Sequence, residues 1–180
     1  RKALNLETSF NIIERAEDAC NGKLNILACF DDEVKVDLGQ PSEEAGKAAL
    51  MALDRAMTDY RSGFYDVLVT APINKATIQG EGFHFPGHTE YIETCVGEGN
   101  KALMILMNEA LRVALVTTHL PIRNVAEAIT QEAIVEKASI FNLSLKGDFR
   151  ISSPRIAVLS LNPHAGDNGL LGNEEKDIII

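Results

Sequence analysis

Short apolar runs alternate along the chain with longer stretches in which apolar and polar residues follow a helical period. A short, continuous apolar run predicts a strand, and Tyr65–Pro72 has the composition of a strand buried on both faces. Because only Asn108, Glu109 and Ala110 separate two of these runs, that pair predicts an antiparallel hairpin. In chain order, strands are expected at Lys23–Phe30, Tyr65–Pro72, Ala102–Met107, Leu111–His119 and Arg155–Leu161.

The amphipathic stretches predict helices. The longest, Gly39–Gly63, has Ser42 where a helix cap is needed and Gly63 where the helix should end. Apolar strands that alternate with such helices indicate an α/β fold, in which a largely parallel sheet is covered on both faces and the hairpin makes the sheet mixed. Further helices are expected at residues 88–97, 120–130, 131–147 and 172–180, with Thr130 and Asn173 capping the last two.

Composition and charge narrow the class of protein. The 180 residues contain no internal repeat, low-complexity tract or linker, so we expect one domain. The formal net charge of −9 argues against nucleic acid or an anionic membrane as the main partner, because both require a basic face. The longest apolar runs are far too short to span a bilayer. Three cysteines without a C-x-x-C pair favour a reducing compartment such as the cytoplasm.

Two of the four histidines follow predicted strands directly. His119 ends the run "RVALVTTH", and His164 lies in "LNPHAGDNG" after the last predicted strand. In open α/β sheets ligands bind beyond the carboxyl ends of the strands, and neutral imidazole is a common metal ligand. The pair therefore predicts a divalent metal site, which needs a third ligand. Alternatively, each histidine only caps a strand end or bonds a loop carbonyl.

The motif "GHTE" opens a predicted helix at Gly87. The free N–H groups of a helix N-terminus favour an anion, and His88 and Thr89 add side-chain donors. We therefore expect a phosphate or carboxylate group of a substrate to bind here. The alternative is that Thr89 only caps the helix.

Lys75 lies beyond another strand end, where "VTAPINKA" leads into a polar, glycine-rich passage with room for one helical turn. A lysine there can meet an anionic substrate or support proton transfer, or it can be a solvated loop residue. The sequence has no G-x-G-x-x-G after a strand, no P-loop, no G-x-S-x-G and no H-E-x-x-H. These familiar motifs therefore assign no function.

Four ordered motifs carry a resemblance to a known family: "VTAPINKA", "FPGHTEYI", "LRVALVTTHLPIRNVAEAIT" and "LNPHAGDNGLLGNEE". From Gln40 onward the chain resembles the 4-hydroxythreonine-4-phosphate dehydrogenase family, PdxA, of vitamin B6 biosynthesis. The resemblance implies a three-layer α/β/α fold like that of isocitrate and isopropylmalate dehydrogenases, and a cytoplasmic homodimer with a shared active site. It also implies that residues 1–180 are the central part of one PdxA-type chain, without the family's N-terminal and C-terminal segments.

The resemblance further implies NAD-dependent oxidation of 4-phosphooxy-L-threonine at its C3 hydroxyl, followed by loss of carbon dioxide to give 3-amino-2-oxopropyl phosphate. His119 and His164 would bind a divalent metal (zinc, magnesium, manganese or cobalt), with a third histidine from outside these residues. His88 and Thr89 would contact the substrate, and no catalytic acid or base is assigned. Two alternatives stay open: a related dehydrogenase for threonate or erythronate 4-phosphate, and a non-catalytic binding protein on the same fold.

Overall fold

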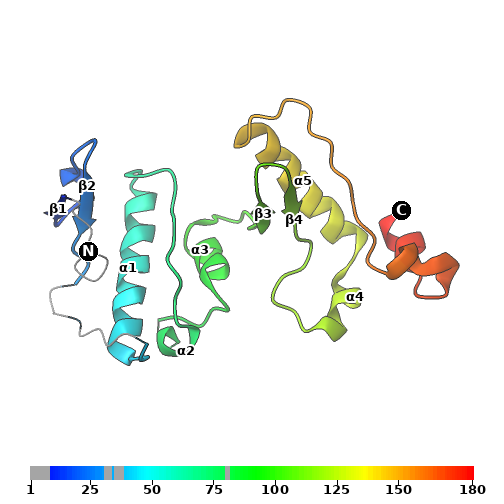
Figure 1. Cartoon of the computed structure of the whole chain (residues 1–180), viewed down its shortest axis with the longest axis horizontal. Coiled ribbons are helices and arrows are strands. Elements are labelled where there is room, and N and C mark those ends of the chain that lie inside the picture. Colours follow the sequence, from blue (N-terminus) through cyan, green and yellow to red (C-terminus); the bar gives the residue numbers. More distant parts are fainter. Residues whose placement is uncertain (1–8, 31–33, 35–38, 80–81) are drawn as a thin grey trace. The chain divides into compact units, whose positions relative to one another are not determined.

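The computed structural model of the chain describes residues 9–30, 34, 39–79 and 82–180. The chain divides into two compact units, residues 1–100 and residues 101–180. Each unit has its own helices and its own small sheet, which can be followed along the colour gradient of Figure 1.

The sheet of unit 1 is a parallel pair of short strands, β1 (Phe10–Ile13) and β2 (Leu24–Leu27). β2 confirms the strand expected at Lys23–Phe30, whereas no strand was expected at β1. The side-chain amide of Asn11 donates to the amide oxygen of Asn25 at 3.2 Å, directly across the pair. This hydrogen bond supports the register of two strands that have no apolar pattern long enough to specify it.

The hydrophobic core of unit 1 forms between α1 (Glu43–Arg61), α2 (Lys75–Ile78) and α3 (His88–Val96). Phe83 has no exposed surface, and its ring centroid lies 5.4 Å from that of Tyr91. Aromatic rings at this separation add favourable contacts to the burial of their apolar area. The buried residues of the core are Leu53, Met57, Ile78, Phe83 and Tyr91.

Two polar contacts fix the helices that surround this core. α1 begins as predicted, because the Ser42 hydroxyl oxygen accepts from the N–H of Ala45 at 3.1 Å. The Tyr91 hydroxyl on α3 donates to the carboxylate of Asp54 on α1. Burial and this hydrogen bond raise the pKa of the Tyr91 hydroxyl, which therefore stays protonated and keeps its role as donor.

Residues 65–72 do not form the buried strand that their apolar sequence predicts. The passage runs alongside α1, and Leu68 packs against the core (Figure 1). Val67 and Val69 are 77% and 89% exposed. A buried strand needs partners at its edges and a layer on each face. Among the described residues no strand pairs with this passage, and only one of its faces is covered.

The sheet of unit 2 is the predicted antiparallel hairpin, formed by β3 (Ile105–Met107) and β4 (Arg112–Ala114). The side-chain oxygen of Asn108 accepts from the N–H groups of Ala110 and Leu111, both at 2.9 Å. This local bonding closes the turn and explains why the separation between the two apolar runs predicts a hairpin correctly.

The longest helix of unit 2 begins where the sequence predicts. α5 (Gln131–Gly147) is capped by Thr130, whose hydroxyl oxygen accepts an N–H of the first turn at 3.1 Å. The helix expected at residues 120–130 consists of a 3₁₀ turn, η3 (Ile122–Asn124), and one α-helical turn, α4 (Val125–Ala128).

The strand expected at Arg155–Leu161 is also not formed. Val158 and Leu159 are 50% and 79% exposed, and among the described residues no strand pairs with this passage. The physical reason is the same as for residues 65–72. An apolar sequence becomes a strand only where partner strands satisfy its backbone N–H and C=O groups.

After this passage the chain turns through η4 (Pro163–Gly169) and then forms one π-helical turn, η5 (Glu175–Ile179). The expected cap by Asn173 is wrong, because Glu174 occupies the N-cap position and no side chain caps the turn. The two glutamates of this region are used instead for contacts with the chain before η4.

The described residues form an α/β protein with helices and two small sheets, one parallel and one antiparallel. Cys20, Cys29 and Cys95 are free thiols. None of the helices in the described part of the chain combines the length and the apolar character needed to cross a membrane.

Truncation of Phe83 tests the core of unit 1. Because this side chain has no exposed surface, Phe83→Ala is expected to lower the free energy of unfolding of the full-length protein by about 3–5 kcal/mol. Urea unfolding followed by circular dichroism measures the change. Phe64→Ala is the matched control, since Phe64 is 44% exposed. Equal losses in the two variants would contradict this assignment of the core.

Candidate active site

The first cluster of expected site residues surrounds the N-terminus of α3. Gly87 is the N-cap residue and no side chain caps the helix. The alternative that Thr89 only caps the helix is therefore wrong. The φ of Gly87 is −178°, an extended conformation that any residue adopts. Glycine therefore matters here for the space that its missing side chain leaves, and not for its backbone conformation.

The space beside Gly87 is bordered by charged groups. A Cβ atom built on Gly87 would lie 3.9 Å from Lys75 Nζ and 3.8 Å from Glu90 Oε2. Lys75 reaches this position because the Asn74 side chain caps α2 and accepts from the N–H of Thr77 at 3.3 Å. The structure thus brings together Lys75 and the "GHTE" motif, which the sequence treats as separate candidates.

His88 adds an unsatisfied polar atom to this cluster. Its Nε2 atom is buried and forms no hydrogen bond with the described residues. Buried polar atoms in proteins almost always have a partner, so an exception indicates a ligand or water site. Together with the helix N-terminus and the Lys75 ammonium group, this imidazole suits a phosphate or carboxylate.

The two histidines expected to bind a metal stand on unusual backbone in unit 2. His119 and His164 are both exposed and have φ values of 54° and 52°. Left-handed backbone is uncommon for residues other than glycine and is concentrated at functional sites. His84 and His88 do not have it.

The donor set for a metal is incomplete in the described residues. No group of three or more His, Cys, Asp or Glu side chains that could hold a metal ion lies among them. Imidazole nitrogens suit zinc and related ions. His119 and His164 therefore fit a metal only as two donors of a larger set.

The turn that carries His164 is left-handed from His164 to Gly169. Residues 164–168 have φ values between 44° and 79°, and Gly169 follows at 95°. For a residue other than glycine this conformation costs about 1–2 kcal/mol. Two backbone hydrogen bonds close the turn, from Leu170 N–H to Asp167 O at 3.1 Å and from Leu171 N–H to Gly166 O at 3.0 Å.

A buried carboxylate lies beneath this turn. Glu175 is 4% exposed, and its Oε1 accepts from the backbone N–H of Asn162 at 2.6 Å. This hydrogen bond holds the pKa of the Glu175 carboxyl below its usual range, against the opposing effect of burial. Neither Asn162 nor Glu175 was expected as a site residue from the sequence. The only signal for them was the pair of glutamates that follows the glycine-rich turn.

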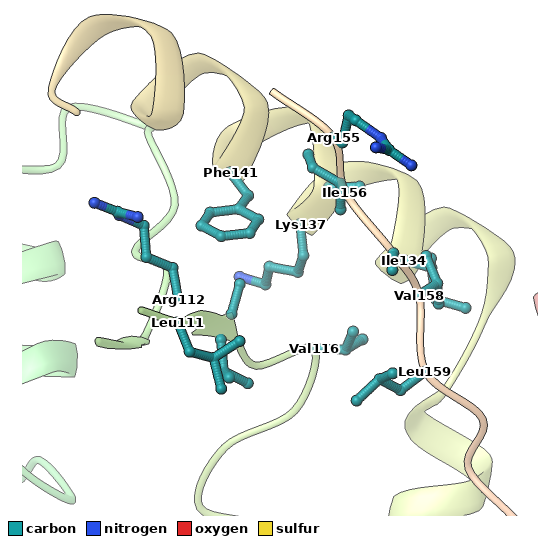
Figure 2. A pocket seen from close by; sticks show the side chains of 14 residues that line it. Leu111, Arg112, Val116, Ile134, Lys137, Phe141, Arg155, Ile156, Val158 and Leu159 are labelled. Carbon is teal, nitrogen blue, oxygen red and sulfur yellow. The ribbon is translucent and has the colours of Figure 1, made fainter. Parts of the chain in front are cut away.

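A cavity in unit 2 does not coincide with the expected site residues. It has a volume of about 390 Å³ and lies in unit 2 between β4, α5 and residues 155–159 (Figure 2). Figure 2 shows Phe141, Ile156 and Val158 among the side chains around it. Neither His119 nor His164 lines it, so the turns, and not this mostly apolar cavity, remain the candidate site.

Fold and site together define an α/β protein in which histidines and a lysine stand on turns and at a helix N-terminus, where proteins of this class bind small anionic ligands. The model of the family described as "Pyridoxal phosphate biosynthetic protein PdxA" matches residues 1–180. The chain belongs to this PdxA family. The resemblance carried by its four motifs is thereby confirmed.

Individual relatives agree with this assignment. A 4-hydroxythreonine-4-phosphate dehydrogenase of Bacteroides thetaiotaomicron is 61% identical over 180 residues, which are 100% of this chain and 50% of the relative. One from Sulfurihydrogenibium is 38% identical over the same length and 55% of the relative. A crystal structure of the enzyme from Klebsiella pneumoniae matches with a TM-score of 0.79 and 31% identity, over 98% of this chain and 54% of that one. The chain thus spans about half the length of the curated relatives it matches.

Substitution of Gly166 tests the geometry of the left-handed turn. A Cβ atom at this position would lie 2.5 Å from the backbone oxygen of Gly172, so Gly166→Ala is expected to destabilise the full-length protein by about 1–3 kcal/mol. Urea unfolding measures the difference. Gly147→Ala at the end of α5 is the control, because its Cβ would meet nothing within 4 Å. An unchanged stability in Gly166→Ala would show that the turn has a different shape.

Proposed function

We propose that the full-length protein oxidises 4-phosphooxy-L-threonine with NAD and releases carbon dioxide to form 3-amino-2-oxopropyl phosphate. The observation that carries this proposal is the cluster around Gly87. Lys75 Nζ borders this N-cap residue of α3, and the next residue, His88, has a buried Nε2 without a hydrogen-bond partner among the described residues. Such a cluster suits a doubly anionic substrate that has a phosphate and a carboxylate. Membership in the PdxA family supports the identity of the reaction.

In the proposed reaction His88 and Thr89 bind an anionic group of the substrate through side-chain donors and the free N–H groups of the helix. Lys75 contributes a positive charge, because its Nζ would lie 3.9 Å from a Cβ atom built on Gly87. These contacts orient carbon C3 of the substrate. To form the ketone, the hydroxyl on this carbon must lose its proton and the C3–H bond must give its hydride to NAD. The β-keto acid then loses its carboxylate as carbon dioxide, and a proton replaces it on carbon.

We assign His119 and His164 to a divalent metal, which is zinc, magnesium, manganese or cobalt. When bound, such a metal polarises the hydroxyl and later the ketone, while NAD accepts the hydride. The two imidazoles supply part of the donor set, and at least one further donor has to come from outside the described residues. No residue is assigned to NAD or to the catalytic acid and base.

The finer architecture is part of the same proposal. We infer that residues 1–180 are the central part of a longer PdxA chain with a three-layer α/β/α fold and a mixed, largely parallel sheet, like that of isocitrate and isopropylmalate dehydrogenases. The exposed apolar passages that include Val67, Val69 and Leu159 support this, because each has the sequence of a strand and no partner among the described strands. A cytoplasmic homodimer with a shared active site completes the proposal.

One assay separates this function from its alternatives. We expect the full-length protein, mixed with NAD and a divalent metal, to form NADH from 4-phosphooxy-L-threonine faster than from threonate or erythronate 4-phosphate. EDTA, His119→Ala and His164→Ala should each reduce the rate by at least about 100-fold, because the polarising ion is lost. Activity that survives all three would overturn the metal assignment. Preference for another ester would favour a related dehydrogenase, and turnover of none would favour a binding protein.

Lys75→Ala tests the anion cluster separately. Loss of one hydrogen bond to a charged group removes about 1.5–3 kcal/mol, so kcat/KM for the phosphorylated substrate is expected to fall by about 10- to 100-fold. Steady-state kinetics of NADH formation measure this change. Lys47→Ala on α1 removes an exposed lysine far along the sequence from the cluster and serves as the control. A kcat/KM equal to that of the control would make Lys75 a solvated residue at the start of α2 without a role in substrate binding.

A further inference from the structure

The left-handed turn at His164 is held from below by one group of side chains. The side-chain amide of Asn162 donates to Glu174 Oε2 at 2.7 Å and to Glu175 Oε2 at 3.1 Å. The backbone N–H of the same residue donates to Glu175 Oε1 at 2.6 Å. We name this group, which consists of Asn162, Glu174 and Glu175, the carboxylate network. It anchors the residue that precedes Pro163 and the turn.

Glu175 also contacts the middle of the turn. A Cβ atom built on Gly166 would lie 3.0 Å from Glu175 Oε2, so the backbone of the turn rests directly above this carboxylate. Gly166 is itself buried, although His164 and the other residues of the turn on either side of it are exposed. The same side chain therefore touches both the entrance and the centre of the turn.

We propose that Glu175 is a positioning residue for His164, and that the carboxylate network holds the turn in the one conformation that presents this imidazole. A turn with several left-handed residues other than glycine persists only where its surroundings determine it. The network supplies part-buried hydrogen bonds to the residue that leads into this turn, and its Glu175 is buried. That His164 binds a metal rests on the proposed function. That the carboxylate network holds the turn does not depend on it.

The chemistry of the network requires an ionised carboxylate at position 175. Both of its oxygens accept hydrogen bonds from Asn162, one from the backbone and one from the side chain. In Glu175→Gln one oxygen becomes an NH₂ group, which faces a donor and cannot accept from it. The size of the side chain is kept, so the substitution changes the hydrogen bonding without opening a cavity.

Hydrogen–deuterium exchange on the full-length protein without added metal tests whether the turn is held. In Glu175→Gln we expect amides in residues 163–172 to exchange at least about tenfold faster, because local opening becomes easier. Peptides from α1 should be unchanged, which shows that the variant is folded. Glu136→Gln is the matched control, since Glu136 is an exposed carboxylate on α5. Unchanged exchange in residues 163–172 would overturn the proposal.

Cobalt binding to the same full-length proteins tests the positioning of His164. Loss of a group that orients a metal ligand typically weakens metal binding by about 10- to 100-fold, and we expect a Co²⁺ Kd raised by that factor in Glu175→Gln together with altered visible absorption. The control should match the wild type. Faster exchange without a change in cobalt affinity or spectrum would show that the network only stabilises the turn, which overturns the positioning role.

A second variant keeps the test decisive if Glu175→Gln does not fold. Asn162→Ala removes the two side-chain hydrogen bonds but keeps the backbone N–H that donates to Glu175. A smaller rise in exchange and in the Co²⁺ Kd is expected, and no rise would overturn the proposal. If the wild-type protein binds no Co²⁺, the metal assignment of the proposed function fails, and exchange alone decides whether the network holds the turn.

Discussion

The packing of Phe83 is the contact on which the substrate side of the candidate site depends. Its ring forms a cluster with those of Tyr91 and Phe85, in which each ring contacts the other two. Among the described residues, Phe83 is the one side chain that is both large and completely buried. The passage it anchors connects α2, which carries Lys75, to α3, which begins at His88. Since Tyr91 is also hydrogen-bonded to α1, the aromatic cluster sets where the two helix starts meet.

In unit 2, polar contacts and not apolar packing position the turn that carries a candidate site residue. His164 stands on a left-handed turn that has little apolar surface to bury, so the backbone cannot be held by hydrophobic packing. Asn162 and Glu175 hold it through short hydrogen bonds to an ionised group, which are stronger than bonds between neutral partners. In both units, the residues with candidate chemistry are presented by loops and helix ends, while the contacts that position them are buried.

Local patterns predicted much of this arrangement. The caps at Ser42 and Thr130, the hairpin at Asn108 and the start of α3 at His88 are all confirmed. Each depends on interactions within a few residues along the chain, which a sequence pattern encodes directly. The strands expected at residues 65–72 and 155–161 are not formed, because strand pairing depends on partners far away in the sequence.

The sequence by itself determined the family and the starts of α1, α3 and α5, and it singled out the candidate residues His88, Thr89, His119 and His164. The tertiary structure decided that Lys75 meets the "GHTE" motif and that Asn162 and Glu175 support the turn of His164. The reason is distance along the chain. Lys75 lies 12 positions before Gly87 and Asn162 lies 13 before Glu175, and such pairs meet only when a turn or helix folds back to close the loop between them.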